Sequence, residues 1–106
     1  MDKLLNLLGL CRRAGKLNIG NDLVIDDILN NKCRLVVMAS DLSKNTEKKI
    51  LLNCHRFNTK SIKLTRTKDE LSWAVGKYCG VASVIDSGFA KKLAQLNETE
   101  NQEDNV

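Results

Sequence analysis

Between residues 33 and 90 the chain alternates short apolar runs with amphipathic segments. Strand-like runs at 33–41, 61–64 and 80–86 are separated by segments of helical periodicity at 43–58 and 67–76. This alternation is typical of helices packed on a sheet. With 106 residues, the chain is long enough for one domain and too short for two. The sequence therefore predicts a small three-layer α/β domain.

Further helices are expected on both sides of this region. An apolar arc from Leu4 to Cys11 predicts an N-terminal helix that ends in a left-handed cap at Gly15, followed by a short edge strand over 16–19. A second helix starts at Gly20-Asn21-Asp22. We expect its inner face to carry Val24, Ile25, Ile28 and Leu29, and its outer face Asp26 and Asp27. The inner face of the helix at 43–58 is expected to carry Ile50, Leu51, Cys54 and Phe57.

Two later helices carry recognisable start signals. Thr67 and Glu70 have the spacing of a capping box, in which each residue satisfies a backbone amide of the other. Asp41 and Asp86 each follow a strand. Carboxylates in such places are sometimes catalytic, but more often they cap the next helix, and Asp86 or Ser87 is expected to cap the last one.

The charge is distributed unevenly along the chain. All 17 Lys and Arg lie within residues 1–92, whereas four of the 13 acidic residues lie in 93–106. The body therefore carries a net charge of +8, although the whole chain carries +4. A body this basic favours an anionic partner, most commonly nucleic acid. The alternative is that the lysines only keep a small protein soluble.

The last residues differ in composition from the body. Residues 97–105 contain no apolar side chain, so we predict one domain over 1–97 and a disordered acidic tail over 98–106. No run reaches the roughly 20 apolar residues that a membrane helix needs, and the N-terminus does not resemble a signal peptide. We therefore expect a cytoplasmic protein without membrane association.

The sequence carries no pattern typical of an enzyme or a cofactor site. It has no glycine-rich nucleotide-binding motif, and cysteines at 11, 33, 54 and 79 match no zinc or redox spacing. Cys54 and His55 are neighbours on a helix, where side chains point about 100° apart, so they cannot form a catalytic pair. We predict no catalytic residues, no metal site and no cofactor.

Five stretches occur in the order found in a known family: LLGLCRRAGKL at 7–17, LVVMASD at 35–41, NTEKKI at 45–50, DELSWAVGK at 69–77 and VIDSGFAKKL at 84–93. Over residues 3–96 the chain resembles the L7Ae/L30e family of ribosomal proteins and, within it, the small bacterial YlxQ-type branch. The resemblance implies an α/β/α sandwich on a four-stranded mixed sheet. It also implies binding to kink-turn RNA, a sharply bent internal loop with tandem sheared G·A pairs.

Family members contact those pairs from the start of the second helix, through Gly, then Asn or Lys, then Glu or Gln, and finally Lys. Counted from Gly20, these positions are Gly20, Asp22, Leu23 and Asp26, of which only the glycine matches. With the frame shifted by one residue, Asn21 and Asp22 resemble the Asn–Glu pair, but the lysine position then becomes Ile25. A helix start also presents free amides and a positive dipole end, which suit phosphate. Asn21 could contact base edges or cap the helix. The predicted RNA-binding residues are Arg13, Lys16, Gly20, Asn21, Asp22, Leu23, Lys77 and Val81, with Arg13 and Lys16 expected to flank the same groove.

Two non-catalytic functions are open at this point. The basic body favours a monomeric, ribosomal-protein-like component of a ribonucleoprotein that binds ribosomal or other structured RNA. Asp26, which stands where the family has lysine, favours a protein-interaction adaptor on the same fold. Trp73 is expected on the outer side of its helix, roughly opposite Leu71, where it would contact RNA or a protein partner. The alternative is that its ring lies across the apolar stems of neighbouring lysines.

Overall fold

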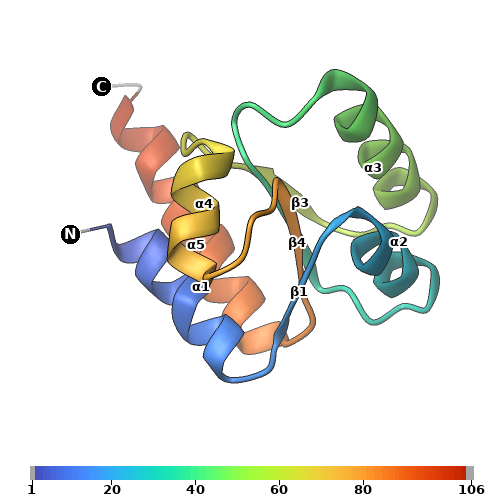
Figure 1. The fold of residues 1–106 in the computed structure, drawn as a ribbon, viewed down its shortest axis with the longest axis horizontal. Helices are drawn as coiled ribbons and strands as arrows, with labels where there is room; N and C mark the ends of the chain where they lie inside the picture. The colour runs from blue at the N-terminus through green and yellow to red at the C-terminus, as the bar shows by residue number, and fades with distance from the viewer. Residues whose placement is uncertain (1, 105–106) are drawn as a thin grey trace.

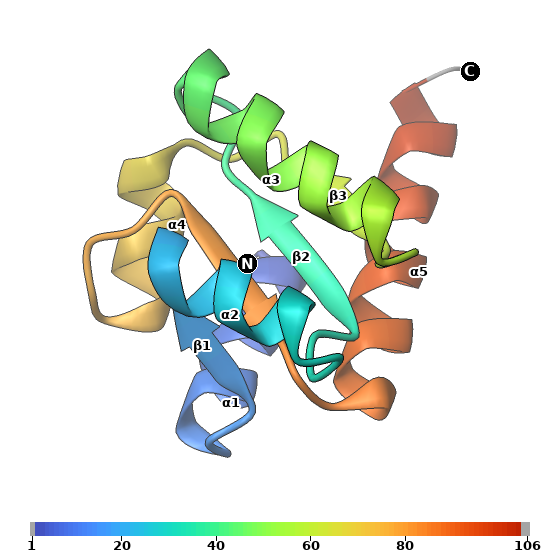
Figure 2. The same cartoon turned by 90° about the vertical axis from the view of Figure 1, so that its right-hand side faces the viewer.

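Five helices enclose a four-stranded sheet in the computed structural model, which describes residues 2–104 (Figure 1). The elements are α1 (Lys3–Arg13), β1 (Leu17–Ile19), α2 (Asn21–Leu29), β2 (Leu35–Met38), α3 (Lys44–Arg56), β3 (Ser61–Lys63), α4 (Lys68–Val75), β4 (Val81–Val84) and α5 (Ser87–Asp104). Helices α2 and α3 cover one face of the sheet, and α1, α4 and α5 cover the other (Figure 2). The predicted three-layer α/β/α sandwich is confirmed.

The sheet is mixed and has the order β1-β4-β2-β3. Strands β2 and β3 are parallel, whereas β4 is antiparallel to both of its neighbours. All residues of β2 and β4 are buried, as expected for central strands covered on both faces. In this register Leu17 pairs with Val84, and Ile19 pairs with Ala82. The two ends of β1 therefore lie at opposite ends of the sheet.

Separate apolar clusters hold the two helical layers to the sheet. The larger one joins α1, α4 and α5 to residues such as Leu35 and Val37, and the smaller one joins α2 and α3 to Val36 and Met38. Alternate residues of β2 thus face opposite layers, which is the two-residue period of a strand. Helices α1 and α4 approach closely at Gly9, where an added Cβ would lie 3.1 Å from the carbonyl oxygen of Ala74.

The predicted helix caps are present, with one difference. Thr67 and Glu70 form the capping box of α4, and Asp86 accepts from the amide of Phe89 at 2.9 Å at the start of α5. Asp41 accepts from the amide of Lys68 at 2.7 Å, so it caps α4 rather than the next helix along the chain. Both strand-end aspartates therefore have structural partners.

The sequence predicted wider buried faces on α2 and α3 than the structure has. Leu29, Leu51 and Phe57 are exposed, because each helix buries only a narrow stripe and no further layer covers its flank. Asp27 was expected outside but is only 6% exposed. Its carboxylate accepts a 2.7 Å hydrogen bond from the side-chain amide of Asn18 on β1, a partner that makes the buried position tolerable.

Helix α5 continues to Asp104, past residue 97, where the sequence predicted the domain to end and a disordered tail to begin. A contact with a distant residue holds the last part of α5 to the rest of the domain, and the composition of residues 98–106 gives no sign of it. Arg66 donates to Asp2 at 2.8 Å and to Glu100 at 2.6 Å, while its side chain is 11% exposed. The hydrogen bonds that Arg66 donates, first to Glu100 and second to Asp2, raise the pKa of Arg66. The bond from Arg66 also lowers the pKa of Asp2. Residues 105–106 lie outside the described residues.

Candidate functional site

The start of α2 is fixed by the backbone of Gly20. This residue adopts φ +103° and ψ 158°, a region essentially restricted to glycine. Its amide donates to the carbonyl oxygen of Val81 at 3.2 Å. The sharp turn and this hydrogen bond place the first turn of α2 beside the loop that leads into β4 (Figure 1).

Helix α2 begins without a side-chain cap, unlike the other helices in the described part of the chain. The side chains of Asp2, Ser43, Thr67 and Asp86 each accept from a first-turn amide. In α2 the capping position is Gly20, which has no side chain to offer, so Asn21 is not the cap. Asn21, Asp22 and Leu23 are all exposed. Their amides are free to bind an anion or a hydrogen-bond acceptor.

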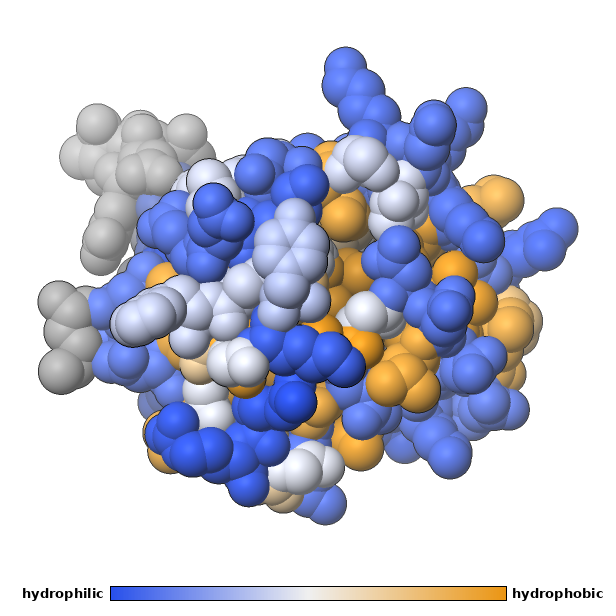
Figure 3. All heavy atoms as spheres, viewed as in Figure 1, coloured by the Kyte–Doolittle hydropathy of each residue, from blue (hydrophilic) through white to orange (hydrophobic). Residues whose placement is uncertain are grey.

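A groove of about 230 Å³ runs beside this turn, between α2 and α3. Asn21 and Asp22 line one wall, and Asn45, Thr46 and Lys49 line the other. Lys49 was not among the site residues predicted from the sequence. The spacing of Asn45 and Lys49 puts them on one face of α3. The sequence does not show that this face borders the start of α2, because that depends on how α2 and α3 pack together. On the side of the molecule that includes β1 and α2, hydrophobic residues are visible at the surface between the two helical layers, among hydrophilic ones (Figure 3).

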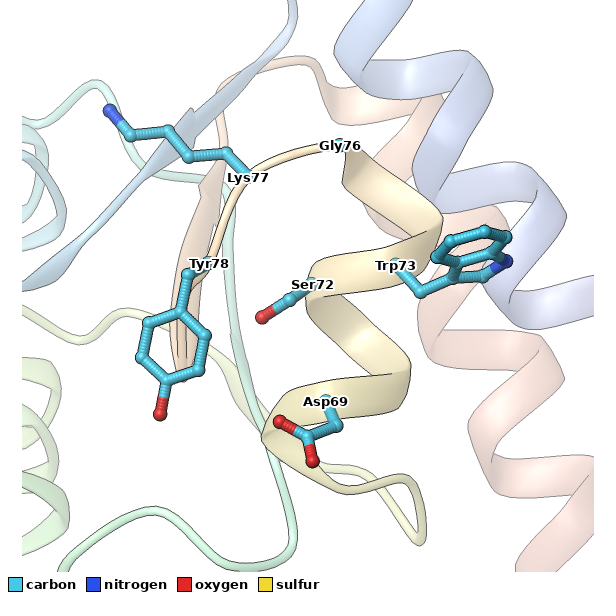
Figure 4. Close-up of a pocket in the computed structure, with 6 residues that line it drawn as sticks. All are labelled: Asp69, Ser72, Trp73, Gly76, Lys77 and Tyr78. Carbon is cyan, nitrogen blue, oxygen red and sulfur yellow. The ribbon is translucent and has the colours of Figure 1, made fainter.

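The loop after α4 forms a second, wider groove of about 500 Å³. Ser72 pins the loop: its hydroxyl accepts from the amide of Cys79 at 2.8 Å and donates to the carbonyl of Cys79 at 3.1 Å. Lys77 and Tyr78 project on one side of α4, and Trp73 projects on the opposite side (Figure 4). Trp73 is 89% exposed, which confirms its predicted exposure, and Tyr78 is 69% exposed.

The structure divides the predicted RNA-binding residues into separate places. Gly20, Asn21, Asp22 and Leu23 lie together at the start of α2, and Lys77 is exposed in the loop that leads to β4. The side chain of Val81 is fully buried, so only its backbone reaches this region.

Arg13 and Lys16 do not flank that groove, contrary to expectation. Lys16 precedes β1 and accepts from the amide of Ile85 through its carbonyl, so it lies at the opposite end of the sheet from Gly20. Arg13 lines a groove of about 470 Å³ between α1 and α4, together with Leu10 and Trp73. Nearness in sequence was misleading, because the whole of β1 separates Lys16 from Gly20.

The cysteines lie in the core rather than in a reactive site. Burial raises the pKa of Cys11 and of Cys54 to about 11, so their thiols carry little thiolate at neutral pH. Within residues 2–104 no group of three or more His, Cys, Asp or Glu side chains is placed to hold a metal ion. No helix in the same range is long and apolar enough to cross a membrane.

Comparisons of sequence place this chain among known proteins. The model of the ribosomal protein L7Ae/L30e/S12e/Gadd45 family matches residues 2–94. RNA-binding protein YlxQ of Enterococcus faecium is 40% identical over 96 residues, which cover 91% of this chain and 92% of that protein. RNA-binding protein YlxQ of Bacillus subtilis (strain 168) is 40% identical over 91 residues, or 85% of this chain and 90% of that protein.

Solved structures with the same fold include two of particular relevance. A protein of unknown function from Bacillus halodurans superposes with a TM-score of 0.87 at 34% identity, covering 92% of this chain and 99% of that one. The Giardia lamblia 15.5kD RNA binding protein superposes with a TM-score of 0.74 at 19% identity, covering 93% and 91%. At that identity the second likeness concerns the fold alone.

Proposed function

The chain belongs to the ribosomal protein L7Ae/L30e/S12e/Gadd45 family, in its YlxQ-type branch, and from this membership we propose that it is a non-catalytic RNA-binding protein. The curated relatives that are 40% identical over most of their length carry the name RNA-binding protein. The basic body fits that role, because lysine and arginine neutralise RNA phosphates.

The RNA that we propose is a kink-turn or a similarly bent structured element, bound at the start of α2. The observation that carries this proposal is the uncapped first turn of α2, whose exposed residues follow a glycine held against Val81. Free amide N–H groups there can donate hydrogen bonds to phosphate or base oxygens. Lys49 lines the groove beside this turn, and Lys77 is exposed in the loop that leads to Val81, the residue to which Gly20 is hydrogen-bonded.

Two exposed leucines on α2 allow a matched test. Leu23 lies in the first turn and is 50% exposed, and Leu29 lies in the last turn and is 47% exposed. We expect Leu23→Glu to weaken binding to a kink-turn hairpin at least tenfold, because it adds a carboxylate beside the phosphates. Leu29→Glu adds the same charge at the other end of the helix and should change affinity less than threefold.

The readout is a titration of a kink-turn hairpin against the same hairpin with its sheared G·A pairs replaced by Watson–Crick pairs. The folded wild-type protein should prefer the kink-turn by at least tenfold. Equal affinity for both hairpins would overturn the kink-turn proposal. Equal loss in the two leucine variants would overturn the placement at α2.

A protein-interaction adaptor is the second candidate, favoured by the exposure of Trp73. Trp73 stands beside the groove between α1 and α4 with Leu10, which is 50% exposed. Exposed tryptophan at the edge of a groove is typical of protein-binding hot spots. For this candidate, binding to every structured RNA should be weak at physiological salt, and Trp73→Ala should abolish capture of the partner.

A further inference from the structure

The end of the sheet opposite to the start of α2 is lined with cations. Each of the three strands that begin there is immediately preceded by an exposed basic residue: Lys16 before β1, Arg34 before β2 and Lys60 before β3. The pairing of the strands puts these three positions in a row along one edge, because Leu17 and Leu35 both pair with Val84 and Val36 pairs with Ser61. We call this edge the basic end.

Part of the basic end is a groove of about 270 Å³ between the sheet and α5. Three cations surround it: Arg34, Lys60 and Lys91. Its floor is apolar, and it opens beside Ser87, which is exposed at the start of α5. The three side chains come from three separate elements, so the fold, and not a run in the sequence, brings them together.

Among the residues that the structure describes, no acidic side chain forms an ion pair with the cations of this groove. No carboxylate lines the groove. Within the described residues, the ion pairs of the protein involve Lys63 and Arg66 and none of these three cations. Asp86 is the carboxylate next to Ser87 in sequence, and it is engaged with the amide of Phe89. The positive potential of the basic end is therefore directed to solvent.

We propose that Arg34, Lys60 and Lys91 form a second RNA-binding surface, which contacts the phosphates of an RNA helix outside the element bound at α2. This inference rests on the proposed RNA-binding function. Cations spread over three elements match the spaced phosphates of an RNA helix, which proteins recognise by its shape and backbone. Contacts to phosphates do not distinguish one base from another. The surface therefore adds affinity for RNA without adding sequence preference.

The test uses the full chain and a plain A-form RNA duplex that lacks any internal loop. At low salt we expect the amide resonances of Lys60, Ser87 and Lys91 to shift on titration. The triple variant R34Q/K60Q/K91Q should bind this duplex at least tenfold more weakly. Its salt dependence should lose about 2 to 3 units of slope, close to one per lost phosphate contact.

A matched triple variant separates this surface from overall charge. K3Q/K48Q/K92Q removes the same charge from exposed positions that do not line the groove, and it should lose less than threefold. Equal losses in both triple variants, absence of the resonance shifts, or equal binding of polyglutamate and RNA would overturn the proposal. Loss of the kink-turn preference in the wild-type protein would instead contradict the function proposed for α2, so the two failures are distinguishable.

Discussion

At one end of the sheet the strands meet Gly20, Ala39, Leu64 and Gly80, and at the other they follow Lys16, Arg34 and Lys60. The first end has no charged residue in these flanking positions, and the one lysine that terminates a strand there, Lys63, is paired with Glu47 at 2.8 Å. It offers backbone amides of an uncapped helix in a fixed turn. The basic end offers lysine and arginine side chains that form no ion pair with any of residues 2–104 for which contacts are described.

This difference suggests a division of labour between the two ends. Backbone groups held in a fixed turn can distinguish the shape of an RNA element, whereas lysine and arginine bind phosphates of any sequence. A small protein with one reading site gains affinity if a second surface holds the adjoining helix, since the second contact becomes intramolecular once the first has formed.

Salt concentration should have the largest effect on RNA affinity, and it should separate the contribution of phosphate contacts from that of shape recognition. If the protein neutralises four to six phosphates in all, log affinity should fall with log salt at a slope of roughly −4 to −5. A rise from about 50 to 200 mM salt then weakens binding several hundred-fold. Titrations at a series of salt concentrations measure this slope for an RNA with a kink-turn and a long flanking helix. A slope near −1 would mean that the basic end contributes little.

Backbone strain should show the next largest effect, because each end contains a glycine with positive φ. An added Cβ would meet nothing within 4 Å at either residue, so strain alone decides the cost. Gly20→Ala, at φ +103°, should lower the free energy of unfolding by about 2–3 kcal/mol and weaken kink-turn binding. Gly15→Ala, at φ +73°, should cost about 1 kcal/mol and leave RNA binding unchanged. Urea unfolding of both variants measures the difference, and equal costs would show that the turn into α2 is not strained.

Charge reversal on α2 should sharpen the comparison further. Asp26 is exposed and stands where the family resemblance places a lysine. Asp26→Lys should strengthen kink-turn binding about tenfold, or roughly 1.4 kcal/mol, by replacing a repulsion with an attraction. Glu98→Lys makes the same change on α5 and should gain less than threefold. Unchanged affinity of the Asp26 variant would indicate that this face of α2 does not touch RNA.

Trp73 belongs to neither end and should show the smallest effect on stability. Because its side chain is 89% exposed, Trp73→Ala should change the free energy of unfolding by less than about 1 kcal/mol. Leu71→Ala on the same helix removes a fully buried side chain and should cost about 2–5 kcal/mol. Thermal or urea unfolding compares the two. A loss of several kcal/mol for the Trp73 variant would show that the indole packs against the protein in solution.

Features set by neighbouring residues could be predicted from the sequence. The apolar run over 35–38 predicts a central strand because burial on both faces requires continuous hydrophobicity. The capping box of Thr67 and Glu70 is a local hydrogen-bonded unit, so its spacing is sufficient to predict it. The exposure of Trp73 follows from the helical phase of Leu71. Each of these predictions concerns one element at a time.

Features that depend on contacts between distant segments could not be predicted in the same way. Lys16 was assigned to the start of α2, although the antiparallel pairing of β1 with β4 carries it to the other end of the sheet. Asp27 was placed outside because its partner, Asn18, lies on another element. The groove at the basic end was missed for the same reason, since Arg34, Lys60 and Lys91 are far apart along the chain.

The bridge made by Arg66 bears on the order in which the molecule can be completed during synthesis. Arg66 binds Asp2, which caps α1, and Glu100, which lies in the last part of α5. Helices α2 and α3 are encoded within residues 21–56 and can contact each other before later residues are added, although their apolar cluster is complete only once Val81 of β4 has been made. Helix α1 cannot complete its packing until α5 has been made, so part of the apolar side of α1, with Leu4 and Leu8, stays accessible in the nascent chain. That interval is when a chaperone would find the most to bind.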